Sequence, residues 1–101
     1  MGEGGGITVY VDDMYRTEMG RFGRMKMSHM IADTEAELHA MAARIGLARR
    51  WYQGDHYDVS MSLRAKAIAA GAVEISMREV AQMAMARRRE HAASQAPAVP
   101  A

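Results

Sequence analysis

The spacing of apolar and polar residues divides this chain into short strands, loops and helices. An apolar, β-branched run at 7–11 (ITVYV) predicts a first strand. The residues Met25–Ala32 predict a second strand, whose alternation places His29 and Ile31 on one face and Ser28 and Met30 on the other. Between them, the Gly- and Arg-rich segment 12–24 predicts a loop.

Three helices are predicted from helical periodicity and from capping residues. Apolar side chains recur at helical spacing after each of three polar start signals. These signals are Thr34 with Glu37, Ser60 or Ser62, and Ser76 with Glu79. Gly46 and Gly71 are placed to end the first two helices. Short strands are predicted between the helices, at 57–59 and 72–75.

The predicted elements follow the order strand, strand, helix, strand, helix, strand, helix. Strands that alternate with helices favour right-handed βαβ units and a parallel sheet. We therefore predict an α/β fold in which a small, mostly parallel sheet of three to four strands packs with three helices. A single domain is expected over 7–91, between a disordered Gly-rich start at 1–6 and a disordered tail at 92–101.

The composition narrows the classes of function. A net charge of +1 implies no strong nucleic-acid or membrane field, and the absence of cysteine excludes disulfides and thiolate zinc sites. No apolar stretch approaches the roughly 18–20 residues that span a bilayer. The first residues lack the basic and apolar regions of a signal peptide, so we expect a cytoplasmic protein without membrane contact. The 11 methionines fit either an adaptable core or the interface of a homodimer.

Two adjacent acids, Asp12 and Asp13, follow the first predicted strand. Ligands of open α/β sheets collect at the carboxyl ends of strands. Paired carboxylates at that position can hold Mg²⁺ or Mn²⁺, with phosphate oxygens and water completing the coordination. A solvated turn is the other interpretation, because Asp is common after strands. Asp33 and Asp58 also follow apolar segments, which keeps the metal interpretation open.

The candidate acid/base residues are His29, His56 and Asp58. His29 lies within the second predicted strand and is either a buried core histidine or a general base. His56 and Asp58 belong to the polar triplet 56–58, which precedes a predicted helix N-terminus, where backbone N–H groups favour anions. Alternatively, Asp58 simply caps that helix. Arg50 lies just upstream and could clamp a phosphate, or it could pair with a nearby acid.

Two further polar features have open interpretations. His39 follows Glu35 by four residues, beside the apolar stripe of the first predicted helix, and is either a boundary histidine or a ligand. The three arginines at 87–89 complement the dipole at the end of the last predicted helix. With the 12–24 loop, they could also contact nucleic acid. No G-x-G-x-x-G, Walker A or G-x-S-x-G pattern is present, so no motif names a reaction.

The segments that carry these residues resemble a known family. They are VYVDD (9–13), SHMIADTEAELHAMAARIG (28–46), RRW (49–51), HYD (56–58) and AAGAVEI (69–75). In order and spacing they are similar to the bacterial and phage family catalogued as domain of unknown function 4031. The similarity covers about residues 7–79. Many members of this family have a proline-rich segment after the first strand, where this chain has Asp13 and a methionine- and arginine-rich loop.

The family has no established activity, so the resemblance implies positions rather than a mechanism. It adds Ser28, Asp33, His39 and Tyr57 to Arg50 as candidate ligand-binding residues, and it marks Glu37 as a further residue to test. Some members look fused to phosphohydrolase-like domains, which hints at phosphate or nucleotide chemistry.

Three hypotheses of function follow from these residues. The first is a site that binds, and could hydrolyse, a phosphate-containing ligand such as a nucleotide. There Asp12 and Asp13 would hold a metal, His29 or His56 would be the acid/base group, and Arg50 would clamp the anion. The alternative is a non-catalytic interaction or oligomerisation module, and the second alternative is a nucleic-acid binder.

Overall fold

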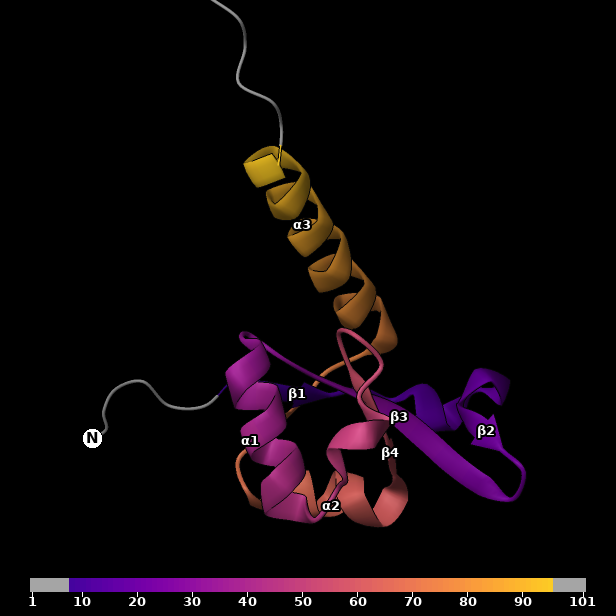
Figure 1. The fold of residues 1–101 in the computed structure, drawn as a ribbon. Helices are drawn as coiled ribbons and strands as arrows, with labels where there is room; N and C mark the ends of the chain where they lie inside the picture. Colours follow the sequence, from indigo (N-terminus) through magenta and orange to yellow (C-terminus); the bar gives the residue numbers. More distant parts are fainter. Residues whose placement is uncertain (1–7, 96–101) are drawn as a thin grey trace, which may run out of the picture.

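The computed structural model describes residues 8–95 of the chain (Figure 1). Its elements, in chain order, are β1 (Val9–Val11), η1 (Met14–Arg16), η2 (Glu18–Gly20), β2 (Arg21–Phe22), β3 (Met25–Ala32), α1 (Glu35–Ile45), η3 (Arg49–Trp51), β4 (Tyr57–Ser60), α2 (Met61–Ala69), β5 (Val73–Glu74) and α3 (Met77–Gln95). The start at 1–6 and the residues 96–101, both predicted to be disordered, lie outside the described residues. α3 extends into the first part of the predicted tail.

Strand β3 is the centre of a five-stranded mixed sheet. Its residue Met30 pairs with Val11 of β1 on one edge and with Tyr57 of β4 on the other. β2 forms an antiparallel hairpin with the beginning of β3, and β5 pairs in parallel with β1. The α/β class and the three helices are therefore confirmed.

The prediction of a mostly parallel sheet is wrong. Among the described strands, β1 and β5 form the one parallel pair, and the other three pairs are antiparallel. The segment 12–24 is the first reason, because it contains η1, η2 and β2 and turns the chain back along β1. The second reason is that α1 and η3 return the chain to β3 in the opposite direction, so this connection is not a βαβ crossover.

The predicted capping residues begin the helices. Thr34 Oγ1 accepts the Glu37 N–H at 3.1 Å. The Glu37 carboxylate accepts the Thr34 hydroxyl and the Thr8 N–H, which ties the start of α1 to the segment before β1. Gly46 ends α1 in the left-handed conformation, with φ 83°. The other two helices are capped by Ser60, and by Ser76 with Glu79.

The hydrophobic core lies between the sheet and the helices α1 and α2. Ser28 and Met30 are fully buried on this side of β3, whereas His29 and Ile31 face α3, so the predicted alternation of faces is confirmed. α3 projects from the opposite side of the sheet (Figure 1). No helix within residues 8–95 combines the length and the apolar character that crossing a bilayer requires. The core residues are Val9, Val11, Met30, Ala32, Leu38, Met41, Ala42, Ile45, Tyr57, Val59, Ala67 and Ala72.

Candidate functional site

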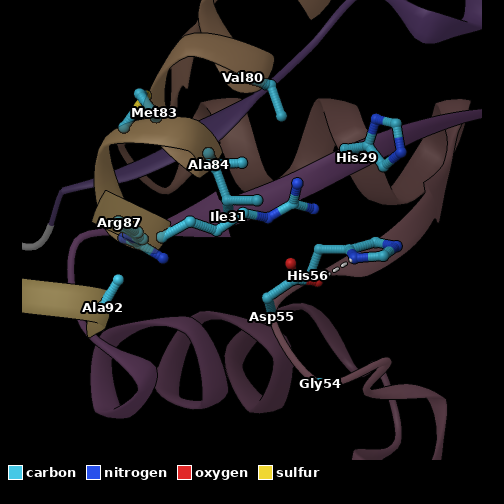
Figure 2. A pocket seen from close by; sticks show the side chains of 11 residues that line it. His29, Ile31, Gly54, Asp55, His56, Val80, Met83, Ala84, Arg87 and Ala92 are labelled. Atoms are coloured by element: carbon cyan, nitrogen blue, oxygen red, sulfur yellow. Dashed lines mark hydrogen bonds and ion pairs between the residues drawn. The ribbon is translucent and has the colours of Figure 1, made fainter. Parts of the chain in front are cut away.

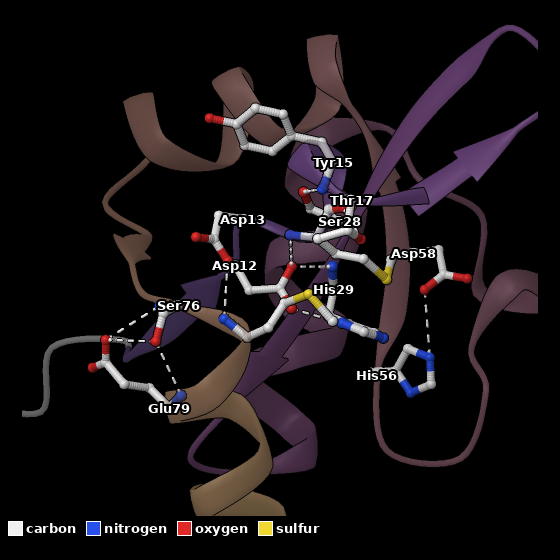
Figure 3. A network of polar contacts seen from close by, with 12 residues as sticks. Asp12, Asp13, Tyr15, Thr17, Ser28, His29, His56, Asp58, Ser76 and Glu79 are labelled. Carbon is white, nitrogen blue, oxygen red and sulfur yellow. Dashed lines mark hydrogen bonds and ion pairs between the residues drawn. The ribbon is translucent and has the colours of Figure 1, made fainter. Parts of the chain in front are cut away.

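Asp12 and His29 form a hydrogen-bonded pair just beyond the carboxyl end of β1 (Figure 3). The pairing of Val11 with Met30 brings these next two residues opposite each other. The Asp12 N–H donates to the His29 carbonyl at 3.0 Å, and Asp12 Oδ1 accepts the His29 N–H at 2.8 Å. Asp12 Oδ2 lies 2.6 Å from His29 Nδ1. The carboxylate of Asp12 is fully buried, and its bonds to His29 hold the imidazole in one orientation.

This pair sets the protonation of the imidazole. An ionised carboxylate can only accept, so Nδ1 of His29 carries a proton and Nε2 is left available. Burial favours a higher pKa for Asp12, but hydrogen bonds from His29 and from the Met14 N–H outweigh it and hold the pKa below its ordinary value. The hydrogen bond to Asp12 raises the pKa of His29 against the opposing effect of burial. His29 is thus suited to holding a proton beside an ionised Asp12.

Arg64 of α2 holds the backbone of Asp12 in place. Its Nε donates to the Asp12 carbonyl at 2.9 Å, and its Nη2 lies 3.1 Å from the Glu74 carboxylate. The guanidinium carbon lies 4.8 Å from the centre of the Tyr15 ring. Arg64 is buried, so its charge is satisfied by the protein rather than by water. The contact with Arg64 therefore helps to fix the backbone position of Asp12 and so of its bond to His29.

His56 and Asp58 lie on the same face of the sheet as His29. Asp58 is the cross-strand partner of His29, and His56 precedes it by two residues, which places both side chains on one side of β4. The ring centroids of His29 and His56 are 5.0 Å apart. His56 Nδ1 lies 2.6 Å from Asp55 Oδ1. The fold therefore brings His29 together with His56 and Asp58, which lie far from it in the sequence.

His29 and His56 line a cavity of about 620 Å³ beneath α3 (Figure 2). The volume lies within the range of small-molecule sites. Arg87 of α3 lies at this cavity and donates a hydrogen bond to the Ala32 carbonyl, which fixes its side chain at the end of β3. The α3 residues at this cavity include the apolar Val80, Met83 and Ala84 and the cations Arg87 and Arg88. The cavity therefore combines two histidines, two arginines, the acidic residue Asp55 and an apolar wall.

Three of the sequence candidates lie on the core side of the sheet. Ser28 is fully buried, and its Oγ accepts the Tyr15 N–H at 3.3 Å. Tyr57 is also fully buried, and its hydroxyl lies 2.8 Å from His39 Nδ1. The other ring nitrogen of His39 lies 3.2 Å from Glu35. Ser28, His39 and Tyr57 thus have protein partners away from the cavity.

Three further candidates are occupied elsewhere. Asp13 Oδ1 accepts the Met77 N–H at 3.0 Å, so this carboxylate caps α3. Asp33 accepts the Tyr10 hydroxyl at 3.1 Å. Arg50 is exposed, with its guanidinium 5.3 Å from the centre of its neighbour's ring, that of Trp51. The cations at the cavity are instead Arg87 and Arg88.

Sequence reasoning missed the roles of Arg64 and Arg87, although both carry a helical signal. Arg64 precedes Ala67 and Ile68 by three and four residues, so it shares the apolar face of α2. Arg87 follows Val80 by seven residues and Met83 by four, which places it on the face of α3 toward the cavity. Both arginines lie at helical spacing from apolar residues, and this pattern is the signal that could have identified them.

Comparison with known proteins places the chain in a family. A family model described as "Protein of unknown function (DUF4031)" matches residues 9–87. The chain belongs to this family. The DUF4031 match contains the Asp12–His29 pair, His56 and Asp58, and ends at Arg87. Neither the curated proteins nor the solved structures provide a significant match.

Proposed function

We propose that this DUF4031 domain binds a phosphate-containing ligand, such as a nucleotide, in the cavity between β3 and α3. One observation carries the proposal: His29, which is bonded to Asp12, lines the same cavity as Arg87 and Arg88. Arginine is suited to phosphate because its planar fork donates two parallel hydrogen bonds to neighbouring oxygens. The apolar wall from α3 would contact the remainder of the ligand.

The same residues support a hydrolytic version of the proposal. Hydrolysis needs a base that takes a proton from the attacking water and an acid that protonates the leaving oxygen. His29 Nε2 suits the base, because the Asp12 carboxylate would stabilise the imidazolium that forms. His56, whose ring lies 5.0 Å from that of His29, suits the acid. Water oxygen would bond to phosphorus as the bond from phosphorus to the leaving oxygen breaks.

Ligand binding can be measured by isothermal titration of inorganic phosphate and ATP into the chelator-treated, tag-free full chain. We expect saturable binding that the double variant Arg87→Ala/Arg88→Ala weakens by about tenfold or more, since charged hydrogen bonds contribute about 1.5–3 kcal/mol. Arg89→Ala is the matched control, because Arg89 is an exposed neighbour on α3 outside the cavity lining. Absence of binding by the wild type, or equal loss in both variants, would contradict the proposed site.

Turnover is tested separately by phosphate release from ATP. If His29 is the base, His29→Gln and Asp12→Asn should lower the rate by roughly 10²–10⁴-fold, the usual contribution of a positioned acid/base group. Wild-type release at background, equal to that of both variants, would remove the hydrolytic version and leave ligand binding.

A second candidate function is a non-catalytic interaction module. The specific observation is a set of large apolar side chains exposed near the β2–β3 hairpin, with Phe22 75 % exposed. A groove of about 430 Å³ runs among them and is lined in part by Met19, Phe22, Met25 and Trp51. Such surfaces commonly bind a partner. Sedimentation should then show a homodimer that Phe22→Ser dissociates, and a strict monomer at high concentration would exclude self-association.

A further inference from the structure

We propose that His29, His56 and Asp58 together bind one divalent transition-metal ion, such as Zn²⁺ or Mn²⁺. One ligand atom from each residue lies within 4.8 Å of the other two. Ligand atoms around a tetrahedral ion with bonds of roughly 2.0 Å are about 3.3 Å apart. Small side-chain rotations would therefore close the cluster around an ion.

The backbone supports this arrangement. His29 and Asp58 are a direct cross-strand pair of the central strand β3 and its neighbour β4, and His56 directly precedes β4. Positions on paired strands are held more firmly than positions on loops, which favours a defined coordination geometry. The side chains of His29 and His56 are 24 % and 23 % exposed, so an ion can reach them from solvent.

Both histidines are oriented as metal ligands usually are. A histidine that binds a metal typically donates its other ring N–H to a carboxylate or a carbonyl. His29 Nδ1 lies 2.6 Å from Asp12, and His56 Nδ1 lies 2.6 Å from Asp55. Each imidazole therefore presents Nε2 as the free nitrogen. Asp12 and Asp55 would be positioning residues for the proposed ion.

The carboxylate of Asp58 is incompletely satisfied without a cation. Its Oδ2 accepts the Gln53 side-chain amide at 2.8 Å. Its Oδ1 is inaccessible to solvent and has no hydrogen-bond donor among the described residues. His56 Nε2 lies 3.4 Å from this Oδ1 (Figure 3). Because an unpaired buried carboxylate oxygen is unfavourable, a metal ion in this position would stabilise it.

The ligand types favour a transition metal over Mg²⁺. Imidazole suits Zn²⁺, and Mn²⁺ binds such a mixed set of imidazoles and carboxylate more weakly, whereas Mg²⁺ prefers oxygen ligands and retains several waters. Three protein ligands also leave a coordination position for water or for a phosphate oxygen. Since His29 and His56 line the cavity, that position would face the bound phosphate. With both Nε2 atoms bound to the ion, His29 and His56 could not also act as base and acid, so the proposed acid/base step would belong to the metal-free chain. In the metal-bound form, the ion would instead activate a bound water. That catalytic meaning rests on the proposed function, although metal binding can be measured alone.

The test is isothermal titration of Zn²⁺, Mn²⁺ and Mg²⁺ into the chelator-treated, tag-free full chain, without phosphate. We expect one Zn²⁺ or Mn²⁺ per chain and no competition from Mg²⁺. Asp58→Asn, which keeps an acceptor for Gln53, should weaken Zn²⁺ binding at least tenfold. Co²⁺ in place of Zn²⁺ should give a visible absorption band, which His29→Gln and His56→Gln remove.

Glu35→Gln is the matched control, because Glu35 is also a carboxylate beside a histidine but lies outside the cluster. It should bind Zn²⁺ as the wild type does, with circular dichroism confirming that every variant is folded. Absence of binding, or wild-type affinity in Asp58→Asn, would overturn the metal site. Loss of Zn²⁺ binding in Asp13→Asn but in no other variant would place the ion at the carboxylates Asp12 and Asp13 and would overturn the proposed site. Phosphate binding that persists in the metal-free protein would leave the proposed function standing when the metal site fails.

Discussion

At the scale of single residues, the candidate site depends on how fully the polar atoms of Asp12 are satisfied. Its carbonyl accepts a hydrogen bond from Arg64, and its carboxylate accepts bonds from the Met14 N–H and from two N–H groups of His29. A charge buried in this way is held in one orientation, because each alternative would leave a donor unpaired. This orientation is what presents His29 Nε2 to the cavity.

Replacing Arg64 should therefore destabilise the protein strongly. Arg64→Met keeps the volume but leaves the Asp12 carbonyl and the Glu74 carboxylate without their donor. We expect a loss of about 3 kcal/mol in the free energy of unfolding, measured by urea denaturation. Glu74→Gln is the control, since Glu74 is 61 % exposed and should lose less than about 1 kcal/mol. Equal losses in the two variants would show that the contact with Asp12 contributes little.

Glu37 provides a pH-dependent prediction outside the cavity. The Thr8 N–H, followed by the Thr34 hydroxyl, holds the pKa of Glu37 below its ordinary value. A lowered pKa in the folded state means that the stabilisation is present above the ordinary pKa and is lost as pH falls through the lowered one. Glu37→Gln should thus be less stable than wild type at pH 7, and the gap should narrow at strongly acidic pH. A gap independent of pH in urea denaturation would refute this.

At the scale of elements, the cavity depends on where α3 begins. Asp13 accepts the first N–H of this helix, and Ser76 and Glu79 form a reciprocal capping box beside it. Asp13, which bonds to the start of α3, directly follows Asp12, which bonds to His29. Two adjacent residues therefore anchor both the Asp12–His29 pair and α3. Arg87 then lies within reach of the end of β3.

Removing the contact between Asp13 and α3 should weaken ligand binding indirectly. Asp13→Ala should cost about 1 kcal/mol, as for a lost helix cap, and should lower phosphate affinity because α3 is held less firmly. Ser60→Ala removes the cap of α2, which lies on the core side, and should cost a similar amount without affecting phosphate affinity. Titration calorimetry and urea denaturation measure the two effects. Unchanged affinity in Asp13→Ala would contradict the role of α3.

The helices could be predicted from sequence more fully than the sheet. Caps such as Thr34 and Ser76 act within one turn, so their signals are local. The alternation of residues along β3 also predicted correctly that His29 and Ile31 lie on one face of the sheet and that Ser28 and Met30 lie on the other. Strand direction and the register of His29 with Asp58 depend instead on how the segments 12–24 and 47–55 turn, which local patterns do not specify. The convergence of the site was therefore beyond sequence reasoning.

At the scale of the whole molecule, the two faces of the sheet have different tasks. The face covered by α1 and α2 holds the hydrophobic core, with Tyr57 and His39 among its polar contacts. The face toward α3 carries His29, His56 and the cavity (Figure 2). The candidate site and the hydrophobic core thus lie on opposite faces of strand β3. A nucleic-acid interface through 12–24 and 87–89 stays a prediction, and it would require binding that weakens steeply with salt.

The most direct test of the phosphate site is to follow the histidine ring resonances by NMR during titration with inorganic phosphate. The account predicts saturable shifts of the His29 and His56 rings, which line the cavity, and an unchanged His39, which lies on the other face. His39 therefore serves as an internal reference within the same molecule. Unmoved His29 and His56 signals, or equal movement of all three rings, would contradict a phosphate site between β3 and α3.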